Sequence, residues 1–372
     1  MRSSASSSFV VALLCAVAAC SAPPASTGPT APIAAPIAAP TSAPVTSNVA
    51  PAASSAATPP PALNPPRGTA APRVEARTFA SAALGVTKRY QVFFPRGYDD
   101  SQHRFPVLYL LHGLGGNEDN WIKHGGLVAA ATLVDVPFII VMPDGDDSFY
   151  VNRPTADSFD VCSKQKPPWD GSEKPETYCV KTPRYEDYVV TDLVAHIDGS
   201  LRTRSDRRAR AIAGLSMGGF GALSLSLRHP DVFSATASHS GMASLLYAGP
   251  HPFAAGKGQL AVDPGAWGGQ YPEKFRAHVK KIFGADIAFW RDHDPTTLVP
   301  KAAPEALTMF VDCGQRDDFK FHDHASLLHE SLEQRGVTHK FALVPGVHDW
   351  KLWTARLPES LKFFTAHFVA QR

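Results

Sequence analysis

The sequence has no excess of charge of either sign, because 36 Lys and Arg residues stand against 34 Asp and Glu residues for a formal net charge of +2. A protein that binds nucleic acid through its phosphates needs a concentrated basic surface, so a nucleic-acid partner is not expected. The sequence also lacks the lysine-containing glycine loop that holds nucleotide phosphates and the glycine triplet that binds dinucleotides. No organic cofactor is therefore expected.

A long hydrophobic segment is missing as well. The apolar run Phe9–Ala19 has eleven residues and would rise only about 16 Å as a helix, roughly half the thickness of a bilayer core. With Arg2 before it and small residues at its end, the run predicts a secretory signal over residues 1–19. Because Cys20 follows two alanines, the segment resembles a bacterial lipoprotein signal. Cys20 would then be acylated and would hold the exported protein to a membrane, and simple secretion is the alternative.

Residues 20–72 contain almost no charge and no aromatic side chain. Arg67 is the only charged residue of this stretch, which consists mainly of Ala, Pro, Ser and Thr. Such a composition cannot bury enough apolar surface to fold, and its proline content favours extended conformations. We therefore predict a spacer over residues 20–72. Residues 73–372 number 300 and are enough for one large domain.

Cysteine is scarce, with five in the chain. Cys15 lies in the signal segment and Cys20 directly after it, which leaves three in the domain. Cys162 and Cys179 lie in one polar stretch. Export permits disulfides, so we predict a bond between them that stabilises the protein by about 3 kcal/mol. Cys313 ends a strand-like run and is predicted to be a small buried hydrophobe.

Short apolar segments recur along the domain without the alternation of half-exposed strands, which indicates strands covered on both faces. Helical spacing appears between them, as at Val189, Leu193 and Ile197 and in the C-terminal stripe from Trp353 to Phe368. Strands that alternate with helices predict an α/β fold, with a mainly parallel sheet and helices on both faces. The apolar segments are Val107–Leu111, Phe138–Met142, Ala209–Ala213, Thr308–Val311 and Phe341–Val344.

Other parts of the domain depart from this alternation. Val74–Ser81 and Thr87–Phe94 are expected to pair as an edge hairpin. Residues 152–184 and 243–306 are long connections, and such connections commonly build lids or binding sites. We expect most aromatic side chains of residues 243–306 to form a satellite core of their own, not to contact a ligand.

The strongest signal is the run AIAGLSMGGFG at residues 211–221, in which G-x-S-x-G stands between a predicted buried strand and a helix. This is the context of a nucleophile elbow, the sharp turn that exposes a reactive serine. Glycines flank the serine because side chains would clash in so tight a turn. We therefore predict Ser216 as a nucleophile. An ordinary strand-to-helix turn capped by a serine is the alternative.

A serine nucleophile needs N–H donors for the oxyanion that forms during attack. The first is expected from the backbone of Met217, directly after the nucleophile. The second is expected from the loop LHGLGG at residues 111–116, where glycines allow close approach of the backbone, and Leu114 is the candidate. His112 in the same loop is predicted to hold the loop in place without a catalytic role.

In proteins with such an elbow, an acid and then a histidine follow the nucleophile in the chain. His348 lies between the last predicted strand and the C-terminal helix and is predicted to be the base. The preceding strand leads into VDCGQRDD at residues 311–318, which supplies the acid. Asp317 is the first choice and Asp318 the alternative, whereas Asp312 is closer to the strand and is expected to be structural.

Acidic and imidazole side chains are dense after this strand, which raises the question of a metal site. Their spacing fits no zinc signature, and the proposed acid already accounts for one of them. A metal is therefore not expected. The residues are Asp317, Asp318, His322, Asp323 and His324.

Together these residues resemble the esterase D family of α/β-hydrolases, which includes tributyrin, feruloyl and acetylxylan esterases, S-formylglutathione hydrolases and mycolyltransferases. The resemblance covers most of residues 75–370. It implies the α/β-hydrolase fold and the roles given above, and it favours Asp317 over Asp318. The insertion that contains Cys162 and Cys179 departs from compact members of the family and leaves the shape of the pocket open. Further matching motifs are MPDG at 142–145, SFY at 148–150, LRHPDVF at 227–233, HDP at 293–295 and GVHDW at 346–350.

The sequence thus predicts an exported serine esterase that hydrolyses carboxylic esters of small molecules or carbohydrates through an acyl-enzyme. Its membrane contact would be through the lipid anchor only. An acyltransferase would use the same residues and pass the acyl group to a carbohydrate hydroxyl. A surface-binding lipoprotein without catalysis is the alternative from another class, although it would not need an elbow, a glycine loop, an acid and a histidine together.

Overall fold

The computed structural model of the chain describes residues 68–153, 155–164, 174–265, 267–303 and 305–371. The predicted signal segment, Cys20 and all but the last few residues of the predicted spacer lie outside the described residues. Within these ranges, no helix is both long enough and apolar enough to cross a membrane.

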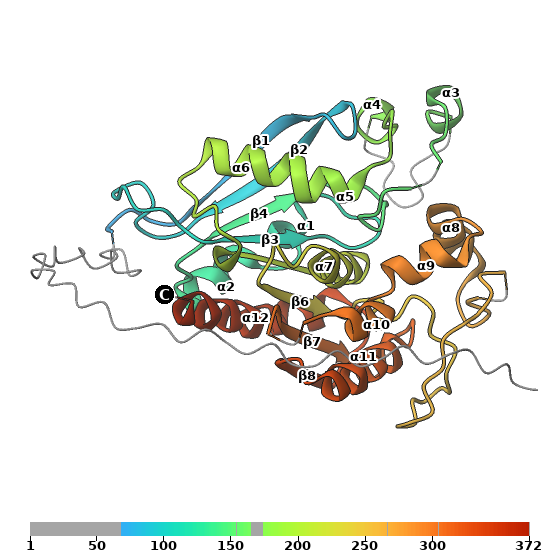
Figure 1. The fold of residues 1–372 in the computed structure, drawn as a ribbon. Helices are drawn as coiled ribbons and strands as arrows, with labels where there is room; N and C mark the ends of the chain where they lie inside the picture. The colour runs from blue at the N-terminus through green and yellow to red at the C-terminus, as the bar shows by residue number, and fades with distance from the viewer. Residues whose placement is uncertain (1–67, 154, 165–173, 266, 304, 372) are drawn as a thin grey trace, which may run out of the picture. The chain divides into compact units, whose positions relative to one another are not determined.

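An eight-stranded sheet forms the centre of the described residues (Figure 1). Its order is β1-β2-β4-β3-β5-β6-β7-β8, and the strands from β3 onwards all run parallel. β1 and β2 form the predicted antiparallel edge hairpin, and β2 also pairs antiparallel with β4. The strands are β1 (Arg73–Ser81), β2 (Val86–Phe94), β3 (Val107–Leu111), β4 (Ile139–Pro143), β5 (Arg210–Leu215), β6 (Ala235–His239), β7 (Thr308–Gly314) and β8 (His339–Val344).

The sequence predicts every parallel strand except β6, with ends that differ by at most three residues. β6 has the sequence ATASH, which lacks the continuous apolar run expected of a strand inside the sheet, although β6 lies between β5 and β7. All of its residues are nevertheless buried. The Thr236 hydroxyl donates to the carbonyl oxygen of Ala222 at 3.1 Å, and His239 bonds two further side chains. Buried polar groups with partners therefore replace the apolar pattern in this strand.

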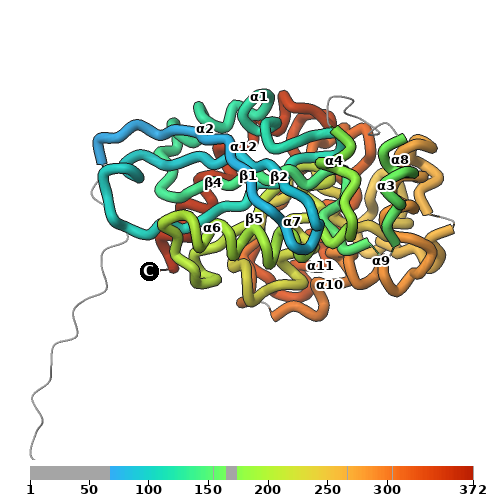
Figure 2. The backbone as a smooth tube through the Cα atoms, turned by 90° about the horizontal axis from the view of Figure 1, so that it is seen from above, coloured from blue at the N-terminus to red at the C-terminus, as the bar shows by residue number. Residues whose placement is uncertain are grey.

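Helices cover both faces of the sheet. They include α1 (Asn120–Lys123), α2 (Leu127–Val134), α6 (Val194–Ser200), α7 (Met217–Arg228), α11 (Phe321–Arg335) and α12 (Trp350–Ala370). Figure 2 looks onto the β1 edge, with α1, α2 and α12 on one side and α6, α7 and α11 on the other. Along β3, Tyr109 packs in the core on the α7 side, whereas Leu108 and Leu110 pack against α2 and α12. The predicted α/β fold is confirmed.

Residues 243–306 contain helices that the sequence does not predict: α8 (Glu273–Phe283), α9 (Ile287–His293) and α10 (Pro295–Leu298). Their aromatic side chains do not form a separate core, so that prediction is wrong. Phe283 packs on Phe220 of α7 with ring centroids 5.7 Å apart, and Phe149 contacts both rings at 5.8 Å. These rings make the segment continuous with the core of the sheet.

The predicted disulfide between Cys162 and Cys179 is confirmed. It joins α3 (Phe159–Cys162) to the residue that follows α4 (Pro175–Tyr178). Cys313 in β7 is buried and forms no disulfide, as predicted.

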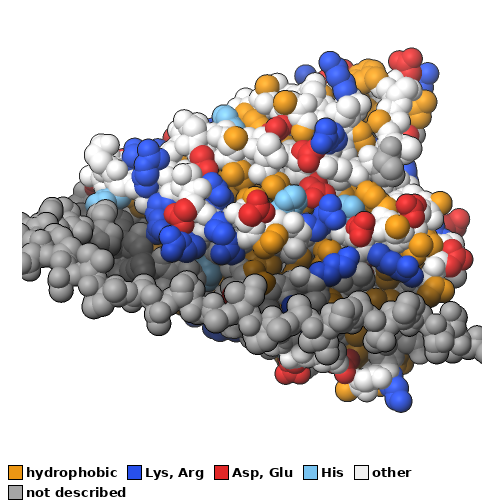
Figure 3. Space-filling model, viewed as in Figure 1, with side chains coloured by type: hydrophobic (Ala, Val, Ile, Leu, Met, Phe, Trp, Pro, Cys, Tyr) orange, Lys and Arg blue, Asp and Glu red, His pale blue; other side chains and the backbone are white. Residues whose placement is uncertain are grey.

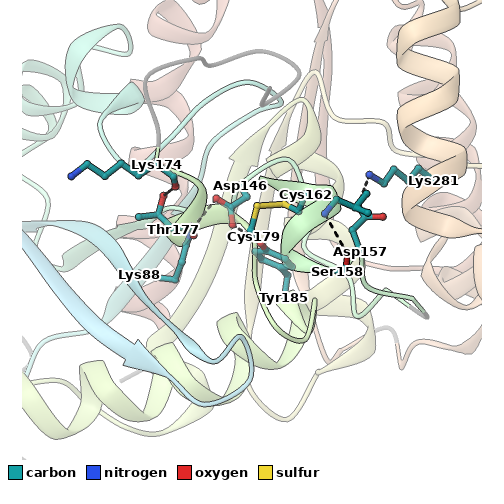
Figure 4. The surroundings of a disulfide bond; sticks show 11 residues. Lys88, Asp146, Asp157, Ser158, Cys162, Lys174, Thr177, Cys179, Tyr185 and Lys281 are labelled. Carbon is teal, nitrogen blue, oxygen red and sulfur yellow. Dashed lines mark hydrogen bonds and ion pairs between the residues drawn. A yellow bond between two sulfur atoms is a disulfide. The ribbon is translucent and has the colours of Figure 1, made fainter. Parts of the chain in front are cut away.

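The disulfide-closed insertion is attached on both sides of the bond (Figure 4). On one side, Asp157 pairs with Lys281 of α8 at 2.6 Å. On the other side, the carbonyl oxygen of Thr177 accepts from Lys88 Nζ of β2 at 3.1 Å. The insertion therefore contacts both α8 and β2.

Candidate active site

Ser216 occupies the sharp turn between β5 and α7. Its backbone has φ 53° and ψ −118°, a conformation that is strained for a residue with a side chain. A Cβ at Gly214 would lie 2.3 Å from the Gly218 carbonyl oxygen, and a Cβ at Gly218 would lie 2.4 Å from the His112 carbonyl oxygen. The Ser216 N–H donates to the His239 carbonyl oxygen at 2.9 Å, which fixes the turn to β6. The geometry is that of the predicted elbow.

His348 lies between β8 and α12, close to this turn. Its Nε2 is 2.9 Å from Ser216 Oγ, and its Nδ1 is 2.6 Å from Asp317 Oδ2. The serine hydroxyl can donate to a neutral Nε2 while Nδ1–H donates to the carboxylate. The next residue, Asp349, accepts the Leu352 N–H at 3.0 Å and begins α12. Three side chains that are far apart in the sequence are thus joined by hydrogen bonds.

Asp317 follows β7 and is only 4% exposed. Its Oδ1 accepts the N–H groups of Phe319 at 3.0 Å and Phe321 at 3.3 Å. Burial alone would raise the pKa of Asp317, but the hydrogen bond and charge of His348 outweigh burial, and the pKa is lowered. Asp318 is exposed, and its Oδ2 lies 3.3 Å from the backbone nitrogen of His348. The geometry therefore places Asp317, not Asp318, against the imidazole.

The glycine loop after β3 lies against the nucleophile. A Cβ at Gly113 would lie 3.3 Å from the Cβ of Ser216. Gly113–Gly116 form a turn closed by a backbone hydrogen bond of 3.0 Å, and Gly115 in it takes φ 75°. The Leu114 N–H has no hydrogen-bond partner among the described residues. The N–H of Met217 is in the first turn of α7, where no intrahelical partner exists. Both predicted donors are therefore available to an oxyanion.

His112 holds this loop to a neighbouring one. Its Nδ1–H donates to the carbonyl oxygen of Gly113 at 2.8 Å, and its Nε2 accepts the Gly145 N–H at 2.9 Å. Acceptance at Nε2 requires a neutral ring with its proton on Nδ1. The side chain is 1% exposed, which leaves it no access to a substrate. His112 thus lies where a structural histidine is predicted.

A pocket of about 650 Å³ lies beside Ser216. The His348 ring forms part of its wall and packs between Phe319 and Trp353, with ring centroids 4.9 and 5.0 Å away. No described residue of the insertion lines this pocket. The insertion contacts α8, whose first turn lines the pocket, through the Asp157–Lys281 pair. The other lining side chains include the apolar Leu114, Phe149, Met242, Phe275, Phe321 and Trp350 and the polar Asn120, His124, Glu273 and Lys274.

Cys313 contacts Asp317, the predicted acid. The sequence does not reveal this contact. Its Sγ lies 3.6 Å from Asp317 Oδ2, on the oxygen that also faces His348. Burial and the nearby carboxylate raise the pKa of the thiol well above its ordinary value. Cys313 therefore stays a neutral, weak donor to Asp317 and is more than the apolar filler that the sequence predicts.

A second serine, histidine and aspartate are connected in the interior. His239 Nδ1 is 2.8 Å from Asp312 Oδ1, and His239 Nε2 is 2.9 Å from Ser360 Oγ. Arg356 Nε donates to the other oxygen of Asp312 at 2.7 Å. Ser360, His239 and Asp312 are each at most 2% exposed, so no substrate can reach them. The group instead fastens α12 to β6 and β7, which agrees with the structural role predicted for Asp312.

The side chains considered for a metal are engaged in other contacts. Asp323 accepts from His251 Nδ1 at 2.5 Å and from the Phe253 N–H at 2.7 Å. His324 Nε2 is 2.7 Å from the Tyr271 hydroxyl. Among the described residues, no group of three His, Cys, Asp or Glu side chains is arranged to hold a metal ion.

A family model named Esterase, with the description "Putative esterase", matches residues 81–364. The chain belongs to this family. The matched range begins at the end of β1 and extends into α12, so it contains Ser216, Asp317 and His348.

Relatives with esterase names share part of the chain. The esterases MT1326 and Rv1288 of Mycobacterium tuberculosis are each 32% identical over 174 residues, which are 47% of this chain and 33% of theirs. An S-formylglutathione hydrolase of Arabidopsis thaliana is 25% identical over 246 residues, which are 64% of this chain and 73% of that protein. The chain thus spans about a third of the length of the mycobacterial esterases.

Solved structures share the fold. The match with a ferulic acid esterase covers 80% of this chain and 98% of that protein, with a TM-score of 0.57 and 24% identity. The match with an S-formylglutathione hydrolase from Agrobacterium tumefaciens covers 80% of this chain and 96% of that protein, with a TM-score of 0.59 and 18% identity. At these identities the likeness concerns the fold alone, and it agrees with the α/β-hydrolase fold predicted from the sequence.

Proposed function

We propose that the chain is an exported serine esterase that hydrolyses carboxylic esters of small molecules or carbohydrates. The observation that carries the proposal is the hydrogen-bonded series Ser216, His348 and Asp317, with contacts of 2.9 and 2.6 Å, in the wall of a pocket. The N–H groups of Leu114 and Met217 lie beside the serine and are available to an oxyanion, which supports the proposal. Membership of an esterase family supports it further.

In the proposed reaction, Ser216 Oγ attacks the ester carbonyl carbon while His348 Nε2 takes the hydroxyl proton. The carbonyl oxygen becomes an oxyanion that accepts from the N–H groups of Leu114 and Met217. When the bond to the alcohol breaks, His348 gives the proton to the leaving oxygen, and the acyl group stays on Ser216. Water then attacks this acyl-enzyme through the same proton transfers and releases the acid. Asp317 orients the imidazole and stabilises its cation.

The pocket supports a substrate with an apolar part held near polar groups. Aromatic side chains such as Phe149 and Phe275 line it together with Asn120 and His124. Outside the pocket, basic and acidic side chains are interspersed on the face viewed in Figure 3. Small or carbohydrate esters therefore fit better than a polyelectrolyte partner. The polar side chains could also hold an acceptor hydroxyl, which keeps an acyltransferase as the second candidate.

The test is a burst assay with p-nitrophenyl esters from acetate to palmitate, with and without a sugar acceptor. We expect a burst of p-nitrophenol that matches the enzyme concentration, because acylation of Ser216 releases the phenol before water removes the acyl group. Steady turnover should not depend on the acceptor, and the preferred chain length should report the size of the pocket. Turnover that rises only with acceptor would identify an acyltransferase. The absence of both a burst and steady turnover on every ester would favour a surface-binding lipoprotein.

We also propose that Cys20 anchors the exported protein to a membrane. The support is the apolar run that ends at Ala18-Ala19-Cys20. Mass spectrometry of the membrane-extracted protein is expected to find a diacylglyceryl group on Cys20 as the first residue of the mature chain. Cys20→Ala should move the protein to the soluble fraction. An unmodified Cys20 would leave simple secretion as the explanation.

A further inference from the structure

Asp147 lies in the loop after β4 and reaches the glycine loop beside the nucleophile. Its Oδ1 accepts the Gly115 N–H at 2.6 Å. Gly115 directly follows Leu114, whose own N–H has no partner among the described residues. Asp147 is half-buried and does not line the pocket, so a substrate in the pocket would not touch it. An effect of the Asp147 side chain on the reaction must therefore pass through the groups that it contacts, among which the glycine loop borders the nucleophile.

We propose that Asp147 is a positioning residue, whose carboxylate keeps the glycine loop in the conformation that offers the Leu114 N–H to the oxyanion. This inference rests on the proposed function. The bond from Gly115 N–H holds the Leu114–Gly115 peptide of the turn against the loop after β4. The Leu114 N–H belongs to the preceding peptide, which is joined to this one at the Leu114 Cα. A shift of the turn away from Asp147 would therefore move the Leu114 N–H with it.

The backbone of Asp147 contacts a second wall of the pocket. Its carbonyl oxygen accepts from His278 Nε2 of α8 at 2.7 Å. The first turn of α8, Glu273–Phe275, lines the pocket. A substitution of the side chain leaves this carbonyl in place. The role of the carboxylate in the glycine loop can therefore be tested separately from the support of α8.

The charge on Asp147 depends on its surroundings. Burial raises the pKa of Asp147 to about 6, although the Gly115 hydrogen bond favours the charged form. The carboxyl group thus becomes protonated as the pH falls through about 6, and its bond to Gly115 then loses charge assistance. The other charged and titratable groups around it are Asp144 and Asp146 of its own loop, Lys88 of β2 bound to both, His112 of the glycine loop and His278 of α8.

The experiment compares Asp147→Ala and Asp147→Asn with the wild type, using kcat, KM and the pH profile of ester hydrolysis. Asp147→Ala should lower kcat by about 100-fold with little change in KM, because the oxyanion donor is misplaced while the pocket remains. Asp147→Asn keeps an acceptor without the charge and should lower kcat by about 10-fold. In the wild type, protonation of Asp147 should lower kcat by up to about 10-fold as the pH falls through about 6, because the protonated carboxyl group resembles the amide of Asp147→Asn. Asp147→Asn should lack this step in the pH profile.

Asp157→Asn is the matched control, because it makes the same chemical change and breaks a contact to α8 without reaching the glycine loop. It should leave kcat within about twofold of the wild type. If Asp147→Ala does not fold, Asp147→Asn carries the test alone. Asp147 variants with unchanged kcat, or the same step near pH 6 in Asp147→Asn as in the wild type, would overturn the inference while leaving the proposed esterase intact. A wild type that hydrolyses no ester would overturn the proposed function itself.

Discussion

Replacement of Ser216 by alanine is expected to lower kcat for ester hydrolysis by about 10⁵- to 10⁶-fold, to the background that the pocket and the backbone donors provide. Ser216 Oγ forms the bond to the acyl group, and without it His348 Nε2 has no hydroxyl to deprotonate. The fold should persist, because alanine retains the backbone N–H that donates to His239. Steady-state kinetics and thermal unfolding of the same preparation measure the two effects.

Ser360→Ala is the matched control for this result. Ser360 also hydrogen-bonds a histidine that binds an aspartate, but it is 1% exposed. Its removal should lower the free energy of unfolding by about 1 kcal/mol and leave kcat within about twofold. If Ser216→Ala instead kept more than about 1% of the wild-type rate, Ser216 would not be the nucleophile.

Asp317→Asn is expected to lower kcat by about 10⁴-fold, whereas Asp318→Asn should change it by no more than about threefold. An amide cannot stabilise the imidazolium, and its NH₂ group favours the wrong tautomer of His348. The exposed Asp318 carboxylate contacts only the backbone nitrogen of His348 among the described residues. Initial rates of the two variants measure this difference, and the reverse ranking would move the acid by one residue.

Asp317→Asn also has a pH signature in stability. The pKa of Asp317 is lowered in the folded protein, so its ionised form stabilises the fold above the unfolded pKa of about 3.9. That stabilisation is lost as the pH falls through the lower, folded pKa. Asp317→Asn should therefore unfold more easily than the wild type at neutral pH, and the difference should shrink in acid.

The parts of the site that the sequence predicts are those encoded by local spacing. Glycines at fixed distances from Ser216 allow the elbow, and the same reasoning identifies the loop that contains Leu114. His348 follows from its place between the last strand and the last helix. The family resemblance favours Asp317 over Asp318, but spacing does not separate two adjacent carboxylates. The structure shows that Asp317 is the one that turns toward the imidazole.

What the sequence does not predict depends on contacts between distant segments. Asp147 and Gly115 are separated by 32 residues, and no spacing rule connects them. β6 is missed because His239 is paired with Ser360, which lies 121 residues away. Among the helices of residues 243–306, α8 has apolar side chains at helical spacing, including Phe275, Val279 and Phe283, and this signal is present in the sequence. The helices α9 and α10 are too short to show such a pattern. The periodicity of a sequence indicates which face of a helix or strand is apolar. It does not indicate which other element that face packs against.

The directions of the edge strands separate the start of the domain from the nucleophile. β1 is antiparallel to β2, and β2 is antiparallel to β4, so β1 runs in the direction of the parallel strands. Arg73, at the start of β1, therefore lies at the edge where those strands begin, whereas Ser216 and His348 follow strands at the opposite edge. Figure 1 shows the sheet and the order of its strands. A spacer that joins the domain at Arg73 leaves the edge with Ser216 open to esters on bulky material.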